Sequence, residues 1–415
     1  MPVTSLGAQA APTAAPTAAQ LDSIRQRLDD AEAALQALRE QLATEASTAL
    51  RTRSRVSLEF SGLALMNVLI NDERVNNVDV PTFAAPAAAG QRPGGLAMSI
   101  RQTRLGLAFG VSEVAGGRFS GDVDIDFFGG QQPSGGGRTF PLVRMRTVRG
   151  ALAWERGSIM VGQEQPLIAG LDPVSLATVG IPGFASAGNL WLWLPQVRGA
   201  VHSTGRVRFG AEAAVLAPTS GEPNGLFDTN FDAAERTATP YAEGLLRVDW
   251  GEDERPAGIT VGYHNGRVAD ANGVGKTSSA VAATVRIPLG SRIELRGEAF
   301  DGQALRGLGG GGIGQGIGLN GAAVRTRGGW AQLNLQATPR LLIGAGSGFD
   351  DPEDGDLVDV PVSPARLRNA TTEAHIHWRP AGPIVLGFEW RRTETTYSAG
   401  PNTNRHLNLA LGFEF

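Results

Sequence analysis

The chain has 415 residues, a formal net charge of −4 and no cysteine. The lack of cysteine excludes disulfides, thiolate metal sites and cysteine catalysis, and the slightly acidic balance gives no indication of nucleic-acid binding. No apolar run reaches the roughly 18 residues of a membrane-spanning helix, so helical transmembrane spans are excluded. The length suits one large barrel or about two to three soluble domains.

Residues 1–19 are rich in alanine, proline and threonine, a composition that predicts disorder. The charged and apolar regions of a signal peptide are missing from this segment. Ala8-Gln9-Ala10 nevertheless has the small-x-small form of a cleavage site. A remnant of a signal peptide and a plain disordered segment explain residues 1–19 equally well.

Residues 20–46 carry a heptad pattern, with leucine every seven residues and a second apolar residue three positions later. Apolar residues at heptad positions a and d predict a coiled-coil helix. The predicted trimerisation seam consists of Leu21, Ile24, Leu28, Leu35, Leu38 and Leu42. Leucine at position a favours trimers or tetramers over dimers. The alternative is a lone amphipathic helix that packs on its own domain.

From about residue 55 the apolar residues recur with period two, which is the side-chain period of a strand. The last ten residues are the clearest case, because Leu407, Leu409 and Leu411 alternate with His406, Asn408 and Gly412. This pattern predicts strands at 55–69, 98–112, 117–129, 143–155, 157–163, 196–203, 205–217, 239–250, 257–265, 276–288, 291–303, 324–337, 339–348, 366–379, 382–395 and 404–415.

The predicted connections alternate between short turns and long segments, which is typical of outer-membrane barrels. A long two-faced strand at the end of a soluble chain would expose an edge that invites aggregation. A closed barrel removes that edge by pairing its last strand with its first. Residues 55–415 are therefore predicted to form an all-β transmembrane barrel of about 16 antiparallel strands.

The longest predicted loop covers about 164–195 and is rich in apolar residues, including Leu167, Ile168 and Trp193. A loop that lay entirely in solvent would not need so much apolar surface. The loop is predicted to fold into the barrel and narrow the pore, or to pack at a subunit interface.

A barrel of this width leaves an aqueous channel. Charged residues that alternate with apolar ones should face this channel, because arginine facing mid-bilayer lipid costs about 2–4 kcal/mol. The predicted pore-lining and substrate-binding residues are Arg104, Arg144, Arg146, Arg198, Arg296, Arg391, Asp122, Asp124 and Asp126. Two opposed ladders of charge would create a transverse field, and the arginine fork suits carboxylates. The alternative is that these charges form salt bridges that brace the barrel.

Other patterns give weaker indications of chemistry. His375 and His377 share a strand face, but two ligands without a third nearby are a weak metal signal. The acidic run 350–356 lacks the EF-hand spacing, and a solvated loop explains it better than Ca²⁺ or lipopolysaccharide binding. None of the five histidines sits beside a convincing nucleophile in the sequence. No metal, cofactor or catalytic residue is predicted.

Several segments of the N-terminal half resemble the DcaP-like trimeric porins of Gram-negative outer membranes. The heptad segment and the barrel pattern share this resemblance, and the matching runs are 101–106, 121–129, 143–146, 161–164 and 194–198. The C-terminal half shares only the barrel pattern. The resemblance implies a homotrimer, a periplasmic coiled coil and a preference for small anionic solutes such as dicarboxylates.

The sequence thus predicts an outer-membrane porin of a Gram-negative bacterium that admits small polar, anionic solutes by passive diffusion. Its expected partners are two further copies of the chain, membrane lipid and lipopolysaccharide, and the solute, but no nucleic acid. A structural tether or adhesin is one alternative. The other is an outer-membrane enzyme such as a barrel lipase or protease, which would need a nucleophile, a base and an orienting group together.

Overall fold

The computed structural model describes residues 56–415, except 89, 91, 130–140, 222–229, 253–254 and 361–362. The predicted disordered segment 1–19 and the predicted coiled-coil helix 20–46 lie outside the described residues. None of the described helices is long and apolar enough to cross a membrane.

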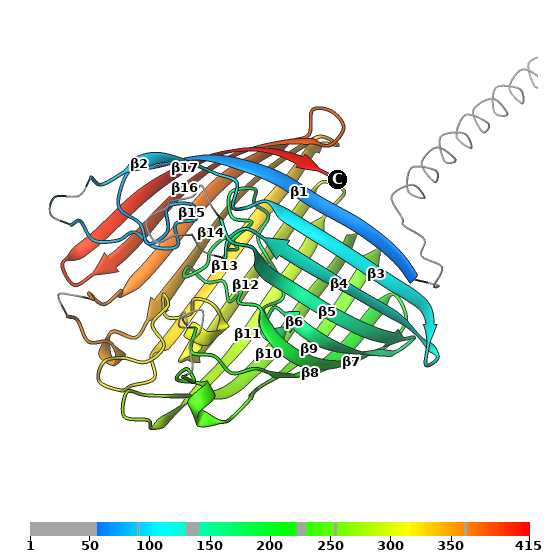
Figure 1. Cartoon of the computed structure of the whole chain (residues 1–415), viewed down its shortest axis with the longest axis horizontal. Coiled ribbons are helices and arrows are strands. Elements are labelled where there is room, and N and C mark those ends of the chain that lie inside the picture. The colour runs from blue at the N-terminus through cyan, green and yellow to red at the C-terminus, as the bar shows by residue number, and fades with distance from the viewer. Residues whose placement is uncertain are drawn as a thin grey trace, which may run out of the picture.

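The described chain is a single antiparallel sheet that closes on itself (Figure 1). Its strands are β1 (Val56–Asn71), β2 (Gly95–Ser99), β3 (Arg104–Val114), β4 (Gly117–Asp126), β5 (Arg144–Trp154), β6 (Gly157–Glu164), β7 (Leu194–His202), β8 (Val207–Leu216), β9 (Tyr241–Glu252), β10 (Arg255–Ala269), β11 (Gly275–Leu289), β12 (Ile293–Gln303), β13 (Arg325–Thr338), β14 (Leu341–Pro352), β15 (Arg368–Trp378), β16 (Ile384–Tyr397) and β17 (Gly400–Glu414). Short 3-10 helices η2 (Leu167–Ala169), η3 (Glu235–Thr237), η4 (Leu305–Leu308) and η5 (Asp354–Asp356) lie in the connections.

The last strand closes the barrel by pairing with the first. Met66 of β1 lies opposite Leu411 of β17, and the antiparallel register runs from Leu63–Glu414 to Asn71–His406. Phe415 adds two backbone hydrogen bonds to Gly62, of 2.8 and 3.0 Å. The aromatic C-terminal strand is therefore a structural part of the wall, and the sheet has no free edge there.

The 17 strand segments occupy 16 positions in the wall. β2 pairs with the second half of β1 and β3 pairs with its first half, so the two short strands lie end to end. At the break between them, the Thr103 hydroxyl bonds to both the N–H and the carbonyl of Leu65, at 3.0 and 3.2 Å. The prediction of a 16-stranded barrel is confirmed.

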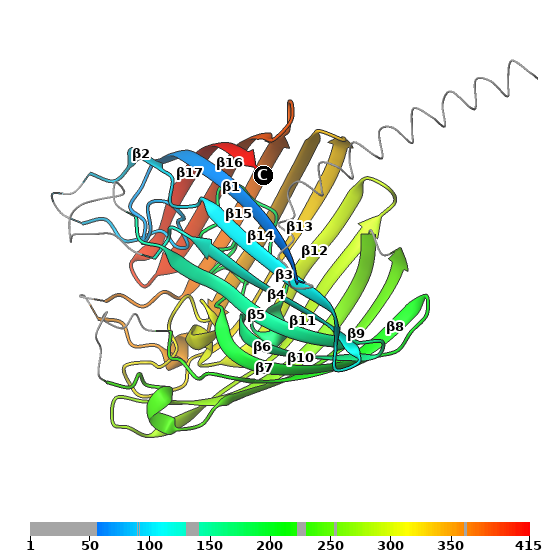
Figure 2. The same ribbon diagram turned by 45° about the vertical axis from the view of Figure 1, so that its right-hand side comes forward.

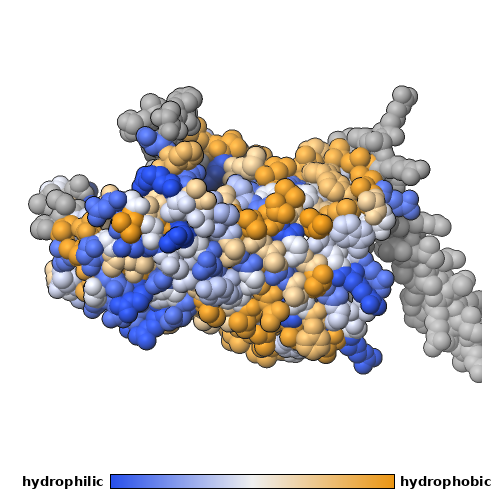
Figure 3. Space-filling view, turned by 90° about the horizontal axis from the view of Figure 1, so that it is seen from below, coloured by the Kyte–Doolittle hydropathy of each residue, from blue (hydrophilic) through white to orange (hydrophobic). Residues whose placement is uncertain are grey.

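The two faces of the wall differ as the alternating pattern predicts. Leu409 and Phe413 are 51% and 56% exposed on the outside, whereas His406 and Asn408 are 2% and 1% exposed on the inside. Figure 3 shows apolar residues spread over the outer wall, with hydrophilic residues gathered toward both of its ends. The outer wall thus presents an apolar surface to its surroundings, and the polar side chains lie within.

The connections differ between the two ends of the barrel (Figure 2). One end carries tight turns, such as 115–116, 155–156 and 339–340, together with the C-terminus and the start of β1. The long connections at the other end are 72–94, 127–143, 165–193, 217–240, 304–324 and 353–367. Two connections at that end are shorter than predicted, namely 270–274 and 398–399, because β10 and β16 end later and β17 begins earlier than the alternation indicated.

Part of the barrel interior is an apolar core. Leu167 and Ile168 from the long loop after β6 pack with Leu305 and Leu308 of η4 and with wall residues such as Leu245. This core fills the sector next to β8–β12, so the apolar loop after β6 folds into the barrel, which is one of the two placements that the sequence predicts. The small inward residues Ala214, Ala280 and Ala282 make room for the loop side chains.

The exposure of the outer wall generates a prediction for its stability in lipid. We expect Leu409→Arg, near the middle of β17, to lower the unfolding free energy by about 2–4 kcal/mol, because the arginine would face hydrocarbon. Phe413→Arg, near the end of the same strand, should cost only about 0–1 kcal/mol. Denaturant unfolding of the barrel in lipid vesicles measures both, and equal costs would contradict a membrane-spanning wall.

Candidate pore and constriction loop

Residues 165–193, here called the constriction loop, run inside the barrel and begin against β9 and β10. The Glu243 carboxylate accepts hydrogen bonds from the Leu167 and Ile168 N–H groups, at 2.5 and 3.3 Å. The Ile168 side chain fits over Gly262, where an added Cβ would lie 2.7 Å from Ile168 Cγ2. A carboxylate and a glycine on adjacent strands thus fix the start of the loop.

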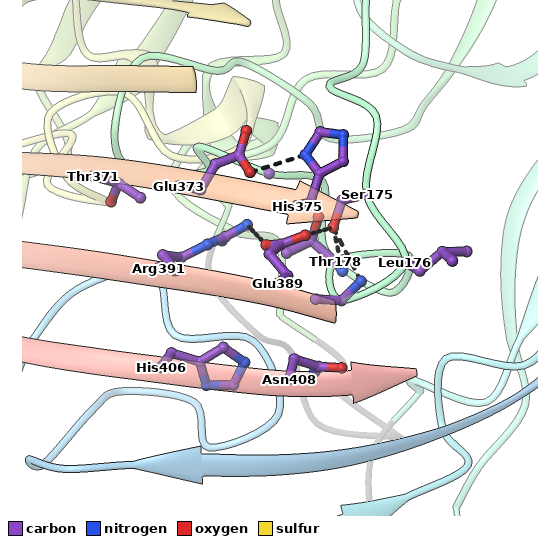
Figure 4. A network of polar contacts seen from close by, with 12 residues as sticks. Ser175, Leu176, Thr178, Thr371, Glu373, His375, Glu389, Arg391, His406 and Asn408 are labelled. Carbon is purple, nitrogen blue, oxygen red and sulfur yellow. Dashed lines mark hydrogen bonds and ion pairs between the residues drawn. The ribbon is translucent and has the colours of Figure 1, made fainter. Parts of the chain in front are cut away.

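The middle of the constriction loop is bound to the strands that follow. Gln332 of β13 pairs with both the N–H and the carbonyl of Val174, at 2.8 and 2.9 Å. The Ser175 hydroxyl donates to Glu389 Oε2 of β16 at 2.5 Å (Figure 4). Asn67 of β1 donates to the Leu176 carbonyl at 3.0 Å. The loop therefore follows the inner wall from β9 round to β1.

The C-terminal part of the constriction loop is also bound to the rest of the barrel by hydrogen bonds and close packing. Gln102 donates to the Ala177 carbonyl at 2.9 Å and accepts from the Gly180 N–H at 3.1 Å. Gly188 has φ +105°, and a Cβ there would lie 2.3 Å from the Gly329 backbone of β13. Only glycine allows this close approach in that conformation.

Asp172 is a titratable group within this loop. Its side chain accepts a hydrogen bond from Gln165 at 2.7 Å. Burial raises the pKa of Asp172 above its ordinary value, against the opposing effect of Arg146. The carboxylate form is thus disfavoured where the loop crosses the pore.

Six of the nine predicted pore-lining residues lie together on β3, β4 and β5. Asp124 lies 2.5 Å from Arg104 and 3.3 Å from Arg146, while Asp126 lies 2.6 Å from Arg144 and 3.0 Å from Arg146. Asp122 pairs with Arg149 at 2.6 Å. Because β4 runs between β3 and β5, acid and base meet on neighbouring strands. The expectation of two opposed ladders with a transverse field is wrong for this group, whose charges neutralise one another locally.

Two further predicted arginines are also paired. Arg296 contacts Glu294 and donates to the Asp172 carbonyl at 2.8 Å, which ties it to the constriction loop. Arg391 is buried and lies 2.6 Å from Glu389. Arg296 and Arg391 thus have the geometry of the alternative interpretation of the sequence, in which inward charges form salt bridges that brace the barrel.

Arg198 differs from the other predicted arginines. Its guanidinium donates to the Gln165 carbonyl at 3.0 Å and to Gln196 Oε1 at 2.9 Å. Both acceptors are neutral, and Arg198 forms no ion pair with a carboxylate in the described part of the chain. Its positive charge is therefore not cancelled by direct contact.

Arg198 lines a cavity of about 820 Å³ between the constriction loop and the short-turn end of the barrel. Gly170 and Leu171 of the loop form one wall of this cavity. Its charged lining consists of five arginines and four carboxylates, namely Arg149, Arg198, Arg208, Arg247, Arg286, Asp122, Glu164, Glu212 and Asp249. The lining thus has an excess of one positive charge.

Four of these cavity arginines are not among the sequence-predicted site residues: Arg149, Arg208, Arg247 and Arg286. The signal for two of them was present, because Arg208 and Arg247 alternate with the outward residues Phe209 and Leu246. The alternation along a strand shows that a side chain points inward. It does not show at which level along the barrel axis the interior remains unfilled, and therefore which inward arginines line a cavity.

One arrangement bears on the enzyme alternative. His264 lies 2.9 Å from Glu243 and 3.1 Å from Ser278 Oγ, so the chain does place a hydroxyl and a carboxylate beside a histidine, which the sequence did not predict. All three side chains are buried. Ser278 also donates to the Ala304 carbonyl at 3.1 Å, and it is absent from the lining of the cavity below the constriction loop. This trio therefore has the contacts of a structural clamp on the loop.

The clamp generates a prediction. We expect Ser278→Ala to lower the unfolding free energy by about 1 kcal/mol, because it removes hydrogen bonds to His264 and Ala304. A fluorophosphonate reagent should not label the wild-type protein at Ser278, because the hydroxyl is out of reach. Labelling detected by mass spectrometry would support the enzyme alternative instead.

Comparison with known proteins gives similarity at the level of structure. No family model matches the chain, and no curated protein matches it. The outer membrane channel DcaP of Acinetobacter baumannii matches with a TM-score of 0.64 at 14% identity, over 89% of this chain and 100% of that chain. The anion-selective porin from Comamonas acidovorans gives 0.55 at 13% identity, over 87% and 100%. OprB of Pseudomonas putida gives 0.54 at 9% identity, over 86% and 94%.

These likenesses cover 89% and 87% of this chain. The chain has the 16-stranded barrel fold of the outer-membrane porins, DcaP among them.

Proposed function

We propose that the protein is a passive diffusion channel in the outer membrane of a Gram-negative bacterium. Three features support this proposal. The outer wall is apolar, the interior carries many polar side chains beside its apolar core, and a cavity of about 820 Å³ lies below the constriction loop. A barrel of 16 strands is too wide for its own side chains to fill.

We further propose that the channel prefers small anionic solutes. The observation that carries this proposal is Arg198, whose charge is not paired with a carboxylate in the described residues and which faces the cavity. Arg149 and Arg247 face the same cavity with side chains 45% and 42% exposed. An arginine fork can bind a carboxylate through two parallel hydrogen bonds.

Dicarboxylates are the solute class that fits best. Such a solute would find several guanidinium groups in the lining of the cavity, together with residues of the constriction loop. The Comamonas protein of the same fold is described as anion-selective, which agrees with this proposal. The paired group on β3, β4 and β5 would brace the wall and bind solute less strongly.

The proposed assembly is a homotrimer with its N-terminal helix in the periplasm. β1 begins at the short-turn end of the barrel, which is the proposed periplasmic side. The heptad seam of residues 20–46 would align the three subunits there. Membrane lipid and lipopolysaccharide would surround the outer wall.

Arg198 provides the test of anion preference. We expect Arg198→Gln to lower the anion-to-cation permeability ratio at least about twofold, because selectivity depends on charge at the narrow part of a pore. The measurement is the reversal potential of single channels under a salt gradient. Arg405→Gln is the matched control, because Arg405 is exposed and pairs with Asp72 at 3.0 Å outside the cavity lining.

The outcomes separate the parts of the proposal. An unchanged ratio in Arg198→Gln would overturn the assignment of the anion site and leave the channel intact. A cation preference of the wild-type protein would overturn the solute class. No conductance at all would favour a tether or adhesin.

A further inference from the structure

Three potential ligand side chains meet on the inner wall behind the constriction loop. Glu373 and His375 lie on the inner face of β15, and Glu389 lies beside them on β16, directly opposite His375 in the register. All three side chains are buried, and one donor atom of each lies within 4.8 Å of the others. In Figure 4 a dashed line joins Glu373 to His375, and Glu389 lies next to Ser175 on the neighbouring strand.

One oxygen of each carboxylate accepts a hydrogen bond from a residue outside this group of three. Gln332 donates to Glu373 Oε1 at 3.0 Å, and Arg391 donates to Glu389 Oε1 at 2.6 Å. The second oxygen of each carboxylate is turned inward: Glu373 Oε2 lies 3.0 Å from His375 Nδ1, and Glu389 Oε2 lies 2.5 Å from Ser175 Oγ. Outer partners that orient the ligands in this way are typical of metal sites.

The imidazole of His375 is also fixed in place. Its ring lies over Gly344 of β14, where an added Cβ would come within 2.3 Å of His375 Cε1. The His377 ring stacks beside it, with ring centroids 4.7 Å apart. The Nε2 atom of His375 is buried and has no hydrogen-bond partner among the described residues. Buried polar atoms are rarely left in this state, and a bound ion is one explanation.

The charges of Glu373, His375 and Glu389 also favour a bound cation. A buried carboxylate is costly unless a cation lies close to it. Arg391 contacts Glu389, whereas Glu373 contacts the neutral Gln332 amide and the His375 ring. Arg391 lies opposite Glu373 in the register but contacts Glu389, so a metal ion beside His375 would give Glu373 the cation that its direct contacts lack.

We propose that Glu373, His375 and Glu389 bind one Zn²⁺ ion. Imidazole nitrogen and carboxylate oxygen are ligands that zinc accepts, and four-coordinate sites are its usual geometry. Ser175 Oγ or a water molecule would complete the coordination. Because Ser175 also accepts hydrogen bonds from the Ala177 and Thr178 N–H groups, at 3.0 and 3.1 Å, the ion would fasten the turn of the constriction loop to the wall.

The test is zinc binding by the purified full-length protein in detergent. The protein is stripped with EDTA, equilibrated with ZnCl₂ and assayed by plasma mass spectrometry and by titration calorimetry. We expect about one zinc per chain, and at least about tenfold weaker binding in Glu373→Gln and Glu389→Gln. His377→Gln is the matched control, because it removes a neighbouring buried histidine that is outside the ligand set and should leave binding unchanged.

Heat-dependent mobility on gels shows whether each variant still forms a barrel, so a loss of zinc in a folded variant is informative. Zinc no higher than in the EDTA-treated protein would overturn the proposal. Equal loss in His377→Gln would also overturn it. The measurement does not depend on conductance, so it stands apart from the proposed solute preference.

Discussion

The closure of the sheet is the constraint on which the rest of this structure depends. A strand edge exposes unpaired N–H and carbonyl groups, and in lipid no water is present to satisfy them. The pairing of β17 with β1 removes that edge and makes the C-terminal residue part of the wall. Once the sheet is closed, period two assigns each side chain either to the apolar outside or to the polar inside.

A barrel of this width then has an interior that its wall residues cannot fill. The constriction loop occupies that space in two chemically different ways. Beside β8–β12 it packs through Leu167, Ile168 and their neighbours as an apolar core. Beside β13–β1 it is held by polar contacts, such as those of Gln332 and Glu389. The inward residues of the wall therefore serve the loop as well as the pore.

This use of the inner wall explains why so few inward charges are left to act on a solute. Asp124, Asp126, Glu294 and Glu389 each neutralise an arginine within reach. Buried charges are stable only when they are paired in this way. Arg198 is an exception because its neighbours are amide and carbonyl oxygens. Selectivity in such a barrel depends on the few inward charges that are not paired in salt bridges.

The sequence by itself determined the barrel, because alternation along each strand is a local property. The 16 strand positions, the inward direction of residues such as Arg104 and Asp124, and the apolar character of the constriction loop all follow from residues close in sequence. Tertiary structure decided which inward residues meet. Ser175 and Glu389 are 214 residues apart, and Glu243 lies 76 residues from Leu167. Strand neighbours and loop paths set such contacts, and no periodicity within a single strand encodes them. For the same reason, the sequence indicated only that His375 and His377 share a strand face, whereas the fold placed Glu389 beside His375.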